Sequence, residues 1–249
     1  MYYVIQRNTW KEPHYDMLID LMERYELEYE IVDYIPFSGE VTFTTKRKDV
    51  FCFGAIKLTE LAKNFDWYPG SLLNNNHDYN VYAPIYGFEN MLNGEGMVIK
   101  GTDDCPLEDE FFFARPTADS KNFKGQKFDH EHWKSFMKDH KDRNDTYLVA
   151  PIKNIQVEVR CWVVGGKVIS ASLYKLGSRV TYVNYDDESF FLDFAQKMVD
   201  KYQPAEAFVI DVCLADDQLK IVEINCINAA GFYKCHLENL IKALENHFS

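Results

Sequence analysis

The stretch that decides the fold is residues 206–225, EAFVIDVCLADDQLKIVEIN, near the C-terminal end of the sequence. Its two alternating apolar runs flank Asp216-Asp217, a pattern that predicts a β-hairpin with a tight turn. A similar pattern precedes it, because Gly165-Gly166 separates two alternating runs in residues 157–175, VEVRCWVVGGKVISASLYK. Two successive hairpins indicate that the second half of the chain is built around antiparallel strands.

The later hairpin carries oxygen-bearing side chains in apolar surroundings. Asp211 lies in the middle of its first strand, and the turn puts it opposite position 222 or 223 of the second. Glu223 and Asn225 are two residues apart in a strand, so they project from the same face. Convergence of the three side chains would suit a hard cation such as Mg²⁺ bound with phosphate oxygens. A solvent-facing polar surface is the alternative, although acids in so apolar a run need a partner, either a metal or a neighbouring basic side chain.

The earlier hairpin supplies candidate cations. Glu158 and Arg160 share a face of its first strand, and Lys175 lies at the end of the return strand. Arginine can hold a phosphate or a carboxylate through two hydrogen bonds, whereas lysine acts as a point charge. A cross-strand pair of glutamate and arginine without a ligand is the plainer alternative.

Residues 114–125, ARPTADSKNFKG, form a small polar loop after a strand that ends at Arg115. The backbone N–H groups of such a loop and the charge of Lys121 can cover phosphates, although an ordinary surface loop has the same composition. The loop lacks the G-x-x-x-x-G-K-[ST] pattern of a phosphate-binding P-loop. The order of these parts along the chain is more informative than any one of them.

The first half of the chain alternates strand and helix patterns. We expect strands at 2–6, 28–35 and 50–53, and helices at 13–27 and about 55–64. This order predicts a small parallel sheet. The stretch 65–95, with its Pro69-Gly70 pair and three consecutive asparagines, is loop-like, and we expect a domain boundary near it.

The second half adds elements around the two hairpins. We expect strands at 110–115 and 147–151, and helices at about 129–142, 187–202 and 235–247. Strands and helices in this order predict an α+β fold with a small α/β lobe leading into an antiparallel lobe.

The composition limits the possible functions. The chain of 249 residues has 39 Asp and Glu against 27 Lys and Arg, a net charge of −12, which argues against a protein that coats duplex nucleic acid. A hydrophobic fraction of 47% supports a substantial core and excludes general disorder. No stretch approaches the roughly 18 to 20 consecutive apolar residues of a membrane span, and no secretion signal is visible. We therefore expect a cytoplasmic protein without a membrane partner.

The cysteines and histidines show no metal-binding pattern. Six cysteines are scattered without a C-x-x-C pair, and seven histidines lack the spacing of metal ligands. Cys161 and Cys213 lie in apolar runs, where a reduced cysteine behaves as a small hydrophobic residue. Buried free thiols are therefore expected rather than disulfides or metal ligands.

The order of the parts resembles the ATP-grasp superfamily over residues 95–249. The shared features are a strand ending in a cation and proline, a lysine-bearing loop, a strand reading YLVAPI, a hairpin with E-x-R and a late D-x(11)-E-x-N. More narrowly, ARPTADSKNFKG, EVRCWVVGGKVISASLYK and VEINCINAAGFY resemble a small bacterial and phage branch, in which arginine replaces a usual nucleotide-binding lysine. The resemblance implies an ATP-grasp fold with an N-terminal α/β lobe at 1–90 and an ATP-grasp domain at 91–249, whose two α+β subdomains enclose the nucleotide.

The resemblance also implies roles for individual residues. Those implied to bind the nucleotide are Arg115 and Lys121 at the phosphates, Val149, Ala150 and Ile152 at the adenine hinge, Glu158, and Asn228 at the phosphate or acceptor end. Those implied to hold Mg²⁺ are Asp211, Glu223 and Asn225, and those implied to act in catalysis are Arg160 and Lys175. Pro151 removes one N–H donor from the hinge. A tight strand-to-helix connection is the alternative reading of the segment that contains Asn228.

The implied activity is that of an ATP- and Mg²⁺-dependent ligase, which joins a carboxylate to an amine through an acyl-phosphate. The acceptor could be a free amino acid, a peptide terminus or a protein side chain. Two further functions use the same nucleotide site. One is an ATP-binding module without catalysis that regulates a partner, and the other is a kinase-like phosphoryl transferase.

Overall fold

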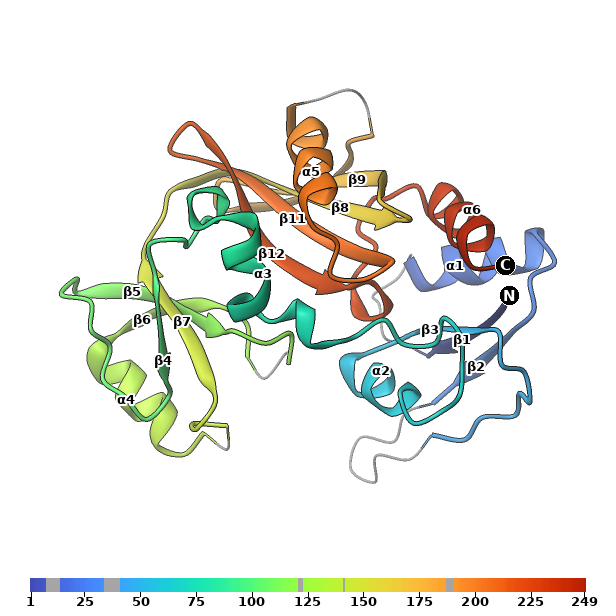
Figure 1. The fold of residues 1–249 in the computed structure, drawn as a ribbon, viewed down its shortest axis with the longest axis horizontal. Coiled ribbons are helices and arrows are strands. Elements are labelled where there is room, and N and C mark those ends of the chain that lie inside the picture. Colours follow the sequence, from blue (N-terminus) through green and yellow to red (C-terminus); the bar gives the residue numbers. More distant parts are fainter. Residues whose placement is uncertain (8–13, 34–40, 121–122, 141, 187–189) are drawn as a thin grey trace.

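The computed structural model describes residues 1–7, 14–33, 41–120, 123–140, 142–186 and 190–249. These residues form a three-stranded sheet of order β2-β1-β3, a four-stranded sheet of order β4-β7-β5-β6 and a five-stranded sheet of order β10-β9-β8-β11-β12. The five-stranded sheet lies between the other two in the molecule (Figure 1). The combination of helices with parallel and antiparallel sheets confirms the predicted α+β class.

The N-terminal lobe is the predicted small parallel sheet. Its elements are β1 (Tyr2–Gln6), α1 (His14–Arg24), β2 (Tyr29–Val32), β3 (Val50–Phe53) and α2 (Ile56–Ala62). Strand β1 lies in the middle and pairs in parallel with both β2 and β3. Every residue of β3 is buried, as expected for a strand covered on both faces.

The segment 65–95 is not the loop that its composition predicts. It contains the 3₁₀ turn η1 (Asn75–His77), helix α3 (Tyr79–Tyr86) and the 3₁₀ turn η2 (Phe88–Asn90). The side chain of Asp78 caps α3 by accepting a hydrogen bond from the backbone N–H of Asn80 at 2.8 Å. The buried tyrosines of α3 pack into the core beneath the five-stranded sheet, and this packing outweighs the poor helix propensity of Pro84 and the asparagines.

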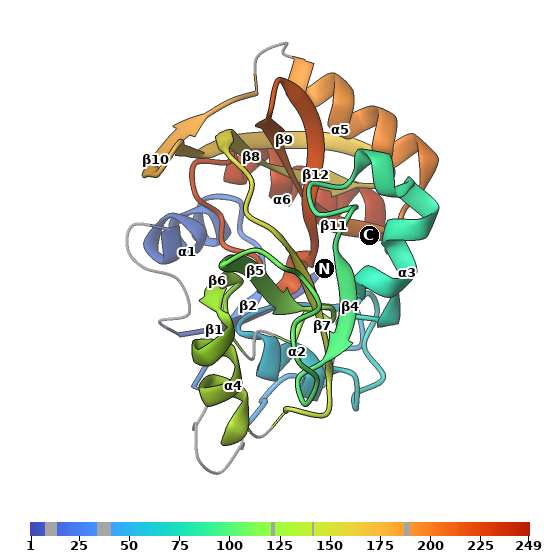
Figure 2. The same ribbon diagram turned by 90° about the vertical axis from the view of Figure 1, so that its left-hand side faces the viewer.

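The four-stranded sheet and one helix form a separate lobe, which faces the viewer in Figure 2. Its elements are β4 (Met97–Lys100), β5 (Phe111–Pro116), β6 (Gln126–Asp129), α4 (His130–Lys138) and β7 (Thr146–Pro151). The aromatic side chains of Phe112, Phe128 and Trp133 form its core. The sequence did not predict β4 or β6, because both are short, largely exposed strands without a clear apolar alternation.

The five-stranded sheet contains both predicted hairpins. Its elements and the flanking helices are β8 (Ile155–Val164), β9 (Lys167–Leu176), β10 (Arg179–Asn184), α5 (Phe190–Lys201), β11 (Ala207–Ala215), β12 (Gln218–Cys226), the 3₁₀ turn η3 (Ile227–Ala229) and α6 (Leu237–Phe248). Gly165 and Gly166 have φ angles of 56° and 75°, and Asp216 and Asp217 have φ angles of 49° and 60°. Two successive left-handed residues are what a two-residue hairpin turn requires. The edge strand β10 was not predicted.

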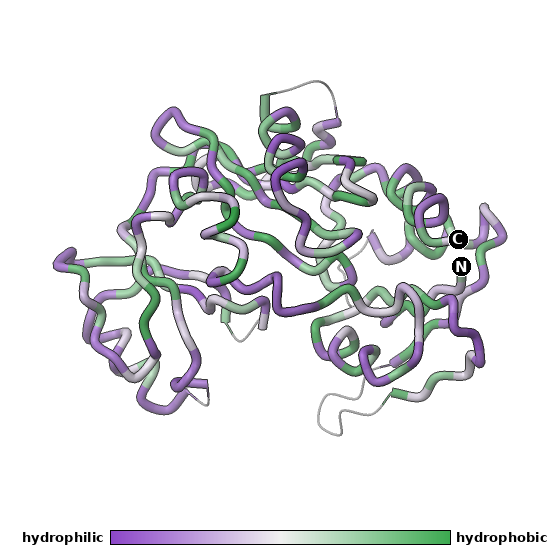
Figure 3. The backbone as a smooth tube through the Cα atoms, in the orientation of Figure 1, coloured by the Kyte–Doolittle hydropathy of each residue, from purple (hydrophilic) through white to green (hydrophobic). Residues whose placement is uncertain are grey.

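The C-terminal helix α6 joins the N-terminal lobe to the five-stranded sheet. Leu240 and Leu244 of α6 share one core with Tyr3 of β1 and Trp162 of β8. The hydroxyl of Tyr3 donates a hydrogen bond to Glu245 at 2.6 Å. The two termini therefore lie side by side, and apolar segments of these elements meet where the hydropathy-coloured tube is green (Figure 3).

None of the helices that the structure describes is long and apolar enough to cross a membrane. All six cysteines are free and buried, which confirms the prediction made from their apolar surroundings.

The buried thiols predict a loss of stability at alkaline pH. Burial raises the pKa of Cys52 and of Cys213 to about 12, whereas a thiol in an unfolded chain ionises near pH 8.5. Above that pH the unfolded state binds fewer protons than the folded state, so stability that is complete below about pH 8.5 is lost as the pH rises toward 12. Each thiol should lower the free energy of unfolding by about 2 kcal/mol at about pH 10.

Urea unfolding at neutral pH and at about pH 10 measures this loss. The variant Cys213→Val should lose less stability than the wild type over the same interval, because one ionising thiol is gone. Equal stability of the wild type at the two pH values would contradict the prediction.

Candidate active site

A β-bulge in the C-terminal hairpin sets the geometry of the site. Val212 pairs with Ile221, but the next residue, Asp211, pairs with Glu223, so Val222 is the extra residue of the bulge. A regular ladder would have put Val222 opposite Asp211. The bulge therefore brings the two carboxylates to the same face of the sheet, and bulges next to functional sites often redirect a side chain in this way.

Arg160 of β8 lies on the other side of Asp211 and is held by it. Its Nε donates to Asp211 Oδ1 at 2.8 Å and its Nη2 donates to Oδ2 at 2.7 Å, a bidentate pair. The side chains are 9% and 1% exposed. Burial alone would lower the pKa of Arg160, but the charge and hydrogen bonds of Asp211 raise it well above its usual value, so the arginine stays charged. The guanidinium also lies over the Tyr233 ring, 4.6 Å from its centroid.

Glu158 pairs with Lys175, not with Arg160. Lys175 Nζ donates to Glu158 Oε1 at 2.5 Å, and the hydroxyl of Tyr174 donates to Oε2 at 2.6 Å. A register shift next to Glu158 allows two consecutive residues of β9 to reach the same carboxylate. The expected alternative of a ligand-free glutamate–arginine pair is therefore wrong, because Arg160 has Asp211 as its partner.

Arg115 reaches across from the four-stranded lobe to the five-stranded sheet. It lies near the end of β5, and its Nη1 is 3.8 Å from Oε2 of Glu223 on β12. Its Nη2 donates to the hydroxyl oxygen of Tyr82 at 2.8 Å, and the guanidinium lies 5.4 Å from the centroid of the Tyr79 ring. Burial lowers the pKa of Arg115, but Tyr82 and Glu223 offset this effect and the pKa is raised overall. A buried, charged arginine therefore meets an acid from another sheet.

The predicted metal-binding side chains come together on β11 and β12. Asn225 Nδ2 donates to Glu223 Oε1 at 3.0 Å and is 3.4 Å from Asp211 Oδ2. Within the described ranges no group of three or more His, Cys, Asp or Glu side chains could hold a metal ion. Two carboxylates and one amide do, however, form the oxygen donor set that a hard cation prefers when phosphate oxygens complete its coordination.

Two adjoining cavities lie over these side chains. The first, of about 460 Å³, is lined by Arg160, Asn225 and Asp119 among others, and the second, of about 440 Å³, by Ile152 and other residues of the interlobe linker. The residues common to both are Arg115, Lys124, Gly125 and Glu223. The arginine and the acid that meet from different sheets thus stand where the cavities join.

The hinge residues differ in their access to the second cavity. Val149 and Ala150 are fully buried in β7, where Val149 pairs with Met97 on one side and Ala114 on the other. Ile152 follows the end of β7, is 49% exposed and lines the cavity together with Pro151 and Lys153. The structure therefore brings Ile152 to the site directly and keeps the other two hinge residues within the sheet behind it.

Asn228 lies outside the lining of both cavities. Its Nδ2 donates to the backbone oxygens of Cys52 at 2.8 Å and Gly70 at 3.1 Å, and its Oδ1 accepts from the N–H of Leu72 at 2.8 Å. The side chain is fully buried and fastens the N-terminal lobe to the end of β12. The structure thus does not bring Asn228 together with the other predicted residues.

Some lining residues were not predicted. Lys121 lies outside the described residues, but Lys124 of the same loop lines both cavities, and its place in ARPTADSKNFKG was a usable signal. Asp119 of that loop accepts a hydrogen bond from the N–H of Cys226 at 3.0 Å and so fastens the loop to β12. Tyr82 was missed because its helix was read as a loop.

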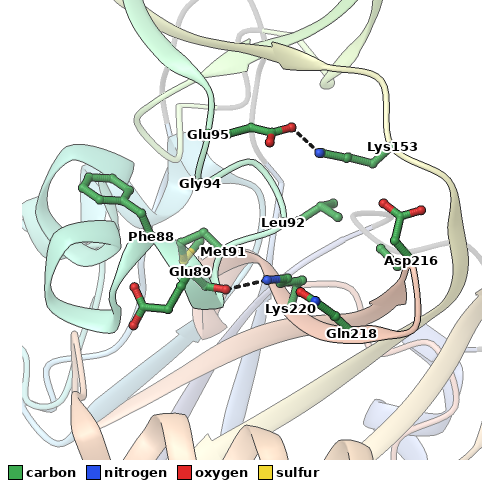
Figure 4. A pocket seen from close by; sticks show the side chains of 11 residues that line it. Phe88, Glu89, Met91, Leu92, Gly94, Glu95, Lys153, Asp216, Gln218 and Lys220 are labelled. Atoms are coloured by element: carbon green, nitrogen blue, oxygen red, sulfur yellow. Dashed lines mark hydrogen bonds and ion pairs between the residues drawn. The ribbon is translucent and has the colours of Figure 1, made fainter.

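A third cavity, of about 370 Å³, lies on the other side of the interlobe linker (Figure 4). Glu95 from the segment that enters the four-stranded lobe forms an ion pair with Lys153 from the segment that leaves it. Lys220 Nζ donates to the backbone oxygen of Glu89 at 2.5 Å. None of the predicted site residues that the structure describes lines this cavity, so we do not assign the chemistry to it.

Comparisons with known proteins agree with this arrangement. A family model described as an ATP-grasp domain, the third family of its clade, matches residues 78–244, a range that begins within the predicted N-terminal lobe. No curated protein sequence matches the chain.

Several solved structures share the fold. That of D-cycloserine synthetase DcsG has a TM-score of 0.66 and 12% identity, with 100% of each chain covered. That of the ATP-grasp ligase PsnB complexed with minimal precursor has a TM-score of 0.60 and 11% identity, covering 100% of this chain and 99% of the other. That of D-alanine–D-alanine ligase from Bacillus anthracis has a TM-score of 0.56 and 11% identity, covering 100% and 93%.

Proposed function

Because the chain belongs to the ATP-grasp domain family, we propose that it is an ATP- and Mg²⁺-dependent carboxylate–amine ligase. A substrate carboxylate oxygen attacks the γ-phosphorus of ATP, and ADP leaves. The amine nitrogen then attacks the acyl carbon of the acyl-phosphate, inorganic phosphate leaves, and the nitrogen loses a proton as the amide forms. The observation that carries the proposal is the meeting of Arg115 and Glu223 from different sheets where the two cavities join.

The second cavity is the proposed nucleotide site. Its linker residue Ile152 offers an exposed apolar surface for adenine, with the buried strand residues Val149 and Ala150 behind it. Pro151 has no N–H to offer to the base. Glu158 and Lys175 line the same cavity, and Arg115 and Lys124 supply positive charge where it joins the first, so the phosphates would lie there. Lys121, from the same loop as Lys124, is proposed to add to that charge.

Asp211, Glu223 and Asn225 are the proposed Mg²⁺ ligands. Their oxygen atoms suit a hard cation, and Glu223 lines both cavities and so can face the phosphate chain. Asp211 also holds Arg160, so Glu223 and Asn225 are the members with more freedom to turn toward an ion. Magnesium would supply positive charge that neutralises the phosphate oxygens.

Arg160 and Lys175 are the proposed catalytic cations. Arg160 lines the first cavity, and its bidentate pairing with Asp211 fixes the guanidinium plane before any substrate binds. It can stabilise negative charge on the transferred phosphoryl group or on the tetrahedral intermediate. Lys175 lines the second cavity, and Glu158 fixes its position. The first cavity then accommodates the carboxylate and the amine. Asn228, buried beside the N-terminal lobe, would support this site from behind.

The proposed substrates are a carboxylate and an amine, either small molecules or a peptide. A solved structure similar in fold is described as PsnB complexed with a phosphomimetic variant of minimal precursor, Mg and ADP, and another is of D-cycloserine synthetase. These likenesses support ATP-dependent ligation of small or peptide substrates. The proposed location is the cytoplasm, which the six free cysteines support because reduced thiols are typical of that compartment.

Release of ADP tests the proposed function. Wild-type protein is incubated with Mg-ATP and pooled amino acids and short peptides, and products are measured by mass spectrometry. We expect ADP together with a product whose mass equals the two substrates minus water, and no such product when magnesium or the amines are omitted. ADP release at the same rate with and without the pool would contradict ligation.

A further inference from the structure

Helix α3 carries three buried tyrosines, and two of them contact Arg115. Tyr79, Tyr82 and Tyr86 are between 0% and 3% exposed and lie on one face of the helix. Arg115 Nη2 donates to the Tyr82 oxygen at 2.8 Å, and its guanidinium lies over the Tyr79 ring. The hydroxyl of Tyr86 points elsewhere and donates to the backbone oxygen of Tyr202 at 2.9 Å.

The Tyr82 oxygen connects two lobes. It accepts one hydrogen bond from Arg115 of the four-stranded lobe and another from the backbone N–H of Ile224, which is next to Glu223 on β12. A single phenol oxygen therefore sets the position of Arg115 relative to the strand that carries Glu223. The direct contact of Arg115 with Glu223 is longer, at 3.8 Å, and leaves the orientation of the guanidinium to Tyr82.

The two arginines of the site are held in different ways. Arg160 is bound through two hydrogen bonds to a buried carboxylate, which neutralises much of its charge. Arg115 is oriented by a neutral phenol, since burial raises the pKa of Tyr82. A neutral acceptor fixes the direction of a guanidinium without cancelling its charge, and the charge remains available to an anionic ligand.

We propose that Tyr82 is a positioning residue that orients Arg115 toward the phosphates of the nucleotide while leaving its charge available to them. This inference rests on the proposed function, because it assumes that the second cavity holds ATP. Tyr82 does not itself touch the ligand, since it lines neither of the two cavities. Its effect should therefore be specific to the charged part of the nucleotide.

The test compares Tyr82→Phe with Tyr86→Phe. Both variants lose one buried hydroxyl from the same face of α3, so they are matched in helix and burial. Affinities for Mg-ATP and for adenosine are measured by calorimetry. Tyr82→Phe should weaken Mg-ATP binding roughly ten-fold and leave adenosine binding unchanged, whereas Tyr86→Phe should preserve the ratio of the two affinities. An unchanged ratio in Tyr82→Phe overturns the inference.

A second measurement covers the case in which Tyr82→Phe is poorly folded. In the Arg115→Lys background, which lacks the guanidinium, Tyr82→Phe should have no further effect on the ratio of affinities, whereas independent effects would overturn the inference. If wild-type protein fails to bind Mg-ATP, the proposed function itself fails. If wild type binds Mg-ATP and Tyr82→Phe binds it equally well, only the positioning role fails.

Discussion

Replacing Arg160 with methionine is expected to lower the free energy of unfolding by about 3–5 kcal/mol, because Asp211 would keep its charge in a buried site without a partner. Asp211 is 1% exposed, and both of its oxygens accept hydrogen bonds from the guanidinium. The long apolar side chain of methionine fills most of the same volume, so the loss of the charge pair dominates over the loss of packing. Urea unfolding measures the change.

The double variant Arg160→Met/Asp211→Asn separates stability from activity. It removes the uncompensated charge, so most of the lost stability should return, whereas ligase activity should stay absent because Arg160 is proposed to act in the reaction. If Arg160→Met alone unfolds at the same urea concentration as the wild type, the pair does not stabilise the fold as argued. If the double variant regains activity, the proposed catalytic role of Arg160 is wrong.

The second large effect is expected from Glu223→Gln. Glu223 lies where the two cavities join, near Arg115 and within hydrogen-bond distance of Asn225. The substitution keeps the size of the side chain but removes its negative charge, which weakens the proposed metal site and the pairing with Arg115. The rate of ADP release should fall by roughly 10²–10³-fold, as is typical when one electrostatic group of an active site is removed.

A matched control for this variant lies on α6. Glu238→Gln makes the same chemical change at an exposed position that is paired with Lys242 and lines neither of the two cavities. The control should release ADP at the wild-type rate, and both variants should unfold at similar urea concentrations. Equal rates for Glu223→Gln and Glu238→Gln would remove Glu223 from the site.

The features that sequence could predict were those set by local patterns. Both hairpins follow from turn residues between alternating apolar runs, and the expected pairing of Asp211 with position 222 or 223 is confirmed. The sequence could not decide between the two positions, because the choice depends on a bulge at Val222 that arises only when the strands pair. Helix α3 was missed since its asparagines and Pro84 resemble a loop, and only burial of its tyrosines explains the helix.

Partner choice across the sheets was harder to predict than the identity of the residues. Arg160 was placed on the correct strand, but its partner Asp211 comes from β11, which spacing within one hairpin could not reveal. The meeting of Arg115 with Glu223 depends on how two lobes pack, and no local pattern encodes that packing. Asn228 looked like a ligand residue because it follows the metal strand, yet its hydrogen bonds are to backbone groups of the N-terminal lobe.

The central claim is that the protein activates a carboxylate with ATP, and trapping with hydroxylamine tests it most directly. Hydroxylamine attacks an acyl-phosphate and yields a stable hydroxamate whatever amine the enzyme normally uses. With Mg-ATP, hydroxylamine and pooled amino acids and peptides, we expect hydroxamate and ADP in equal amounts, and neither from Glu223→Gln at a comparable rate. ADP formed together with a stable phosphorylated product, or binding of Mg-ATP without ADP from any carboxylate in the pool, would contradict the claim.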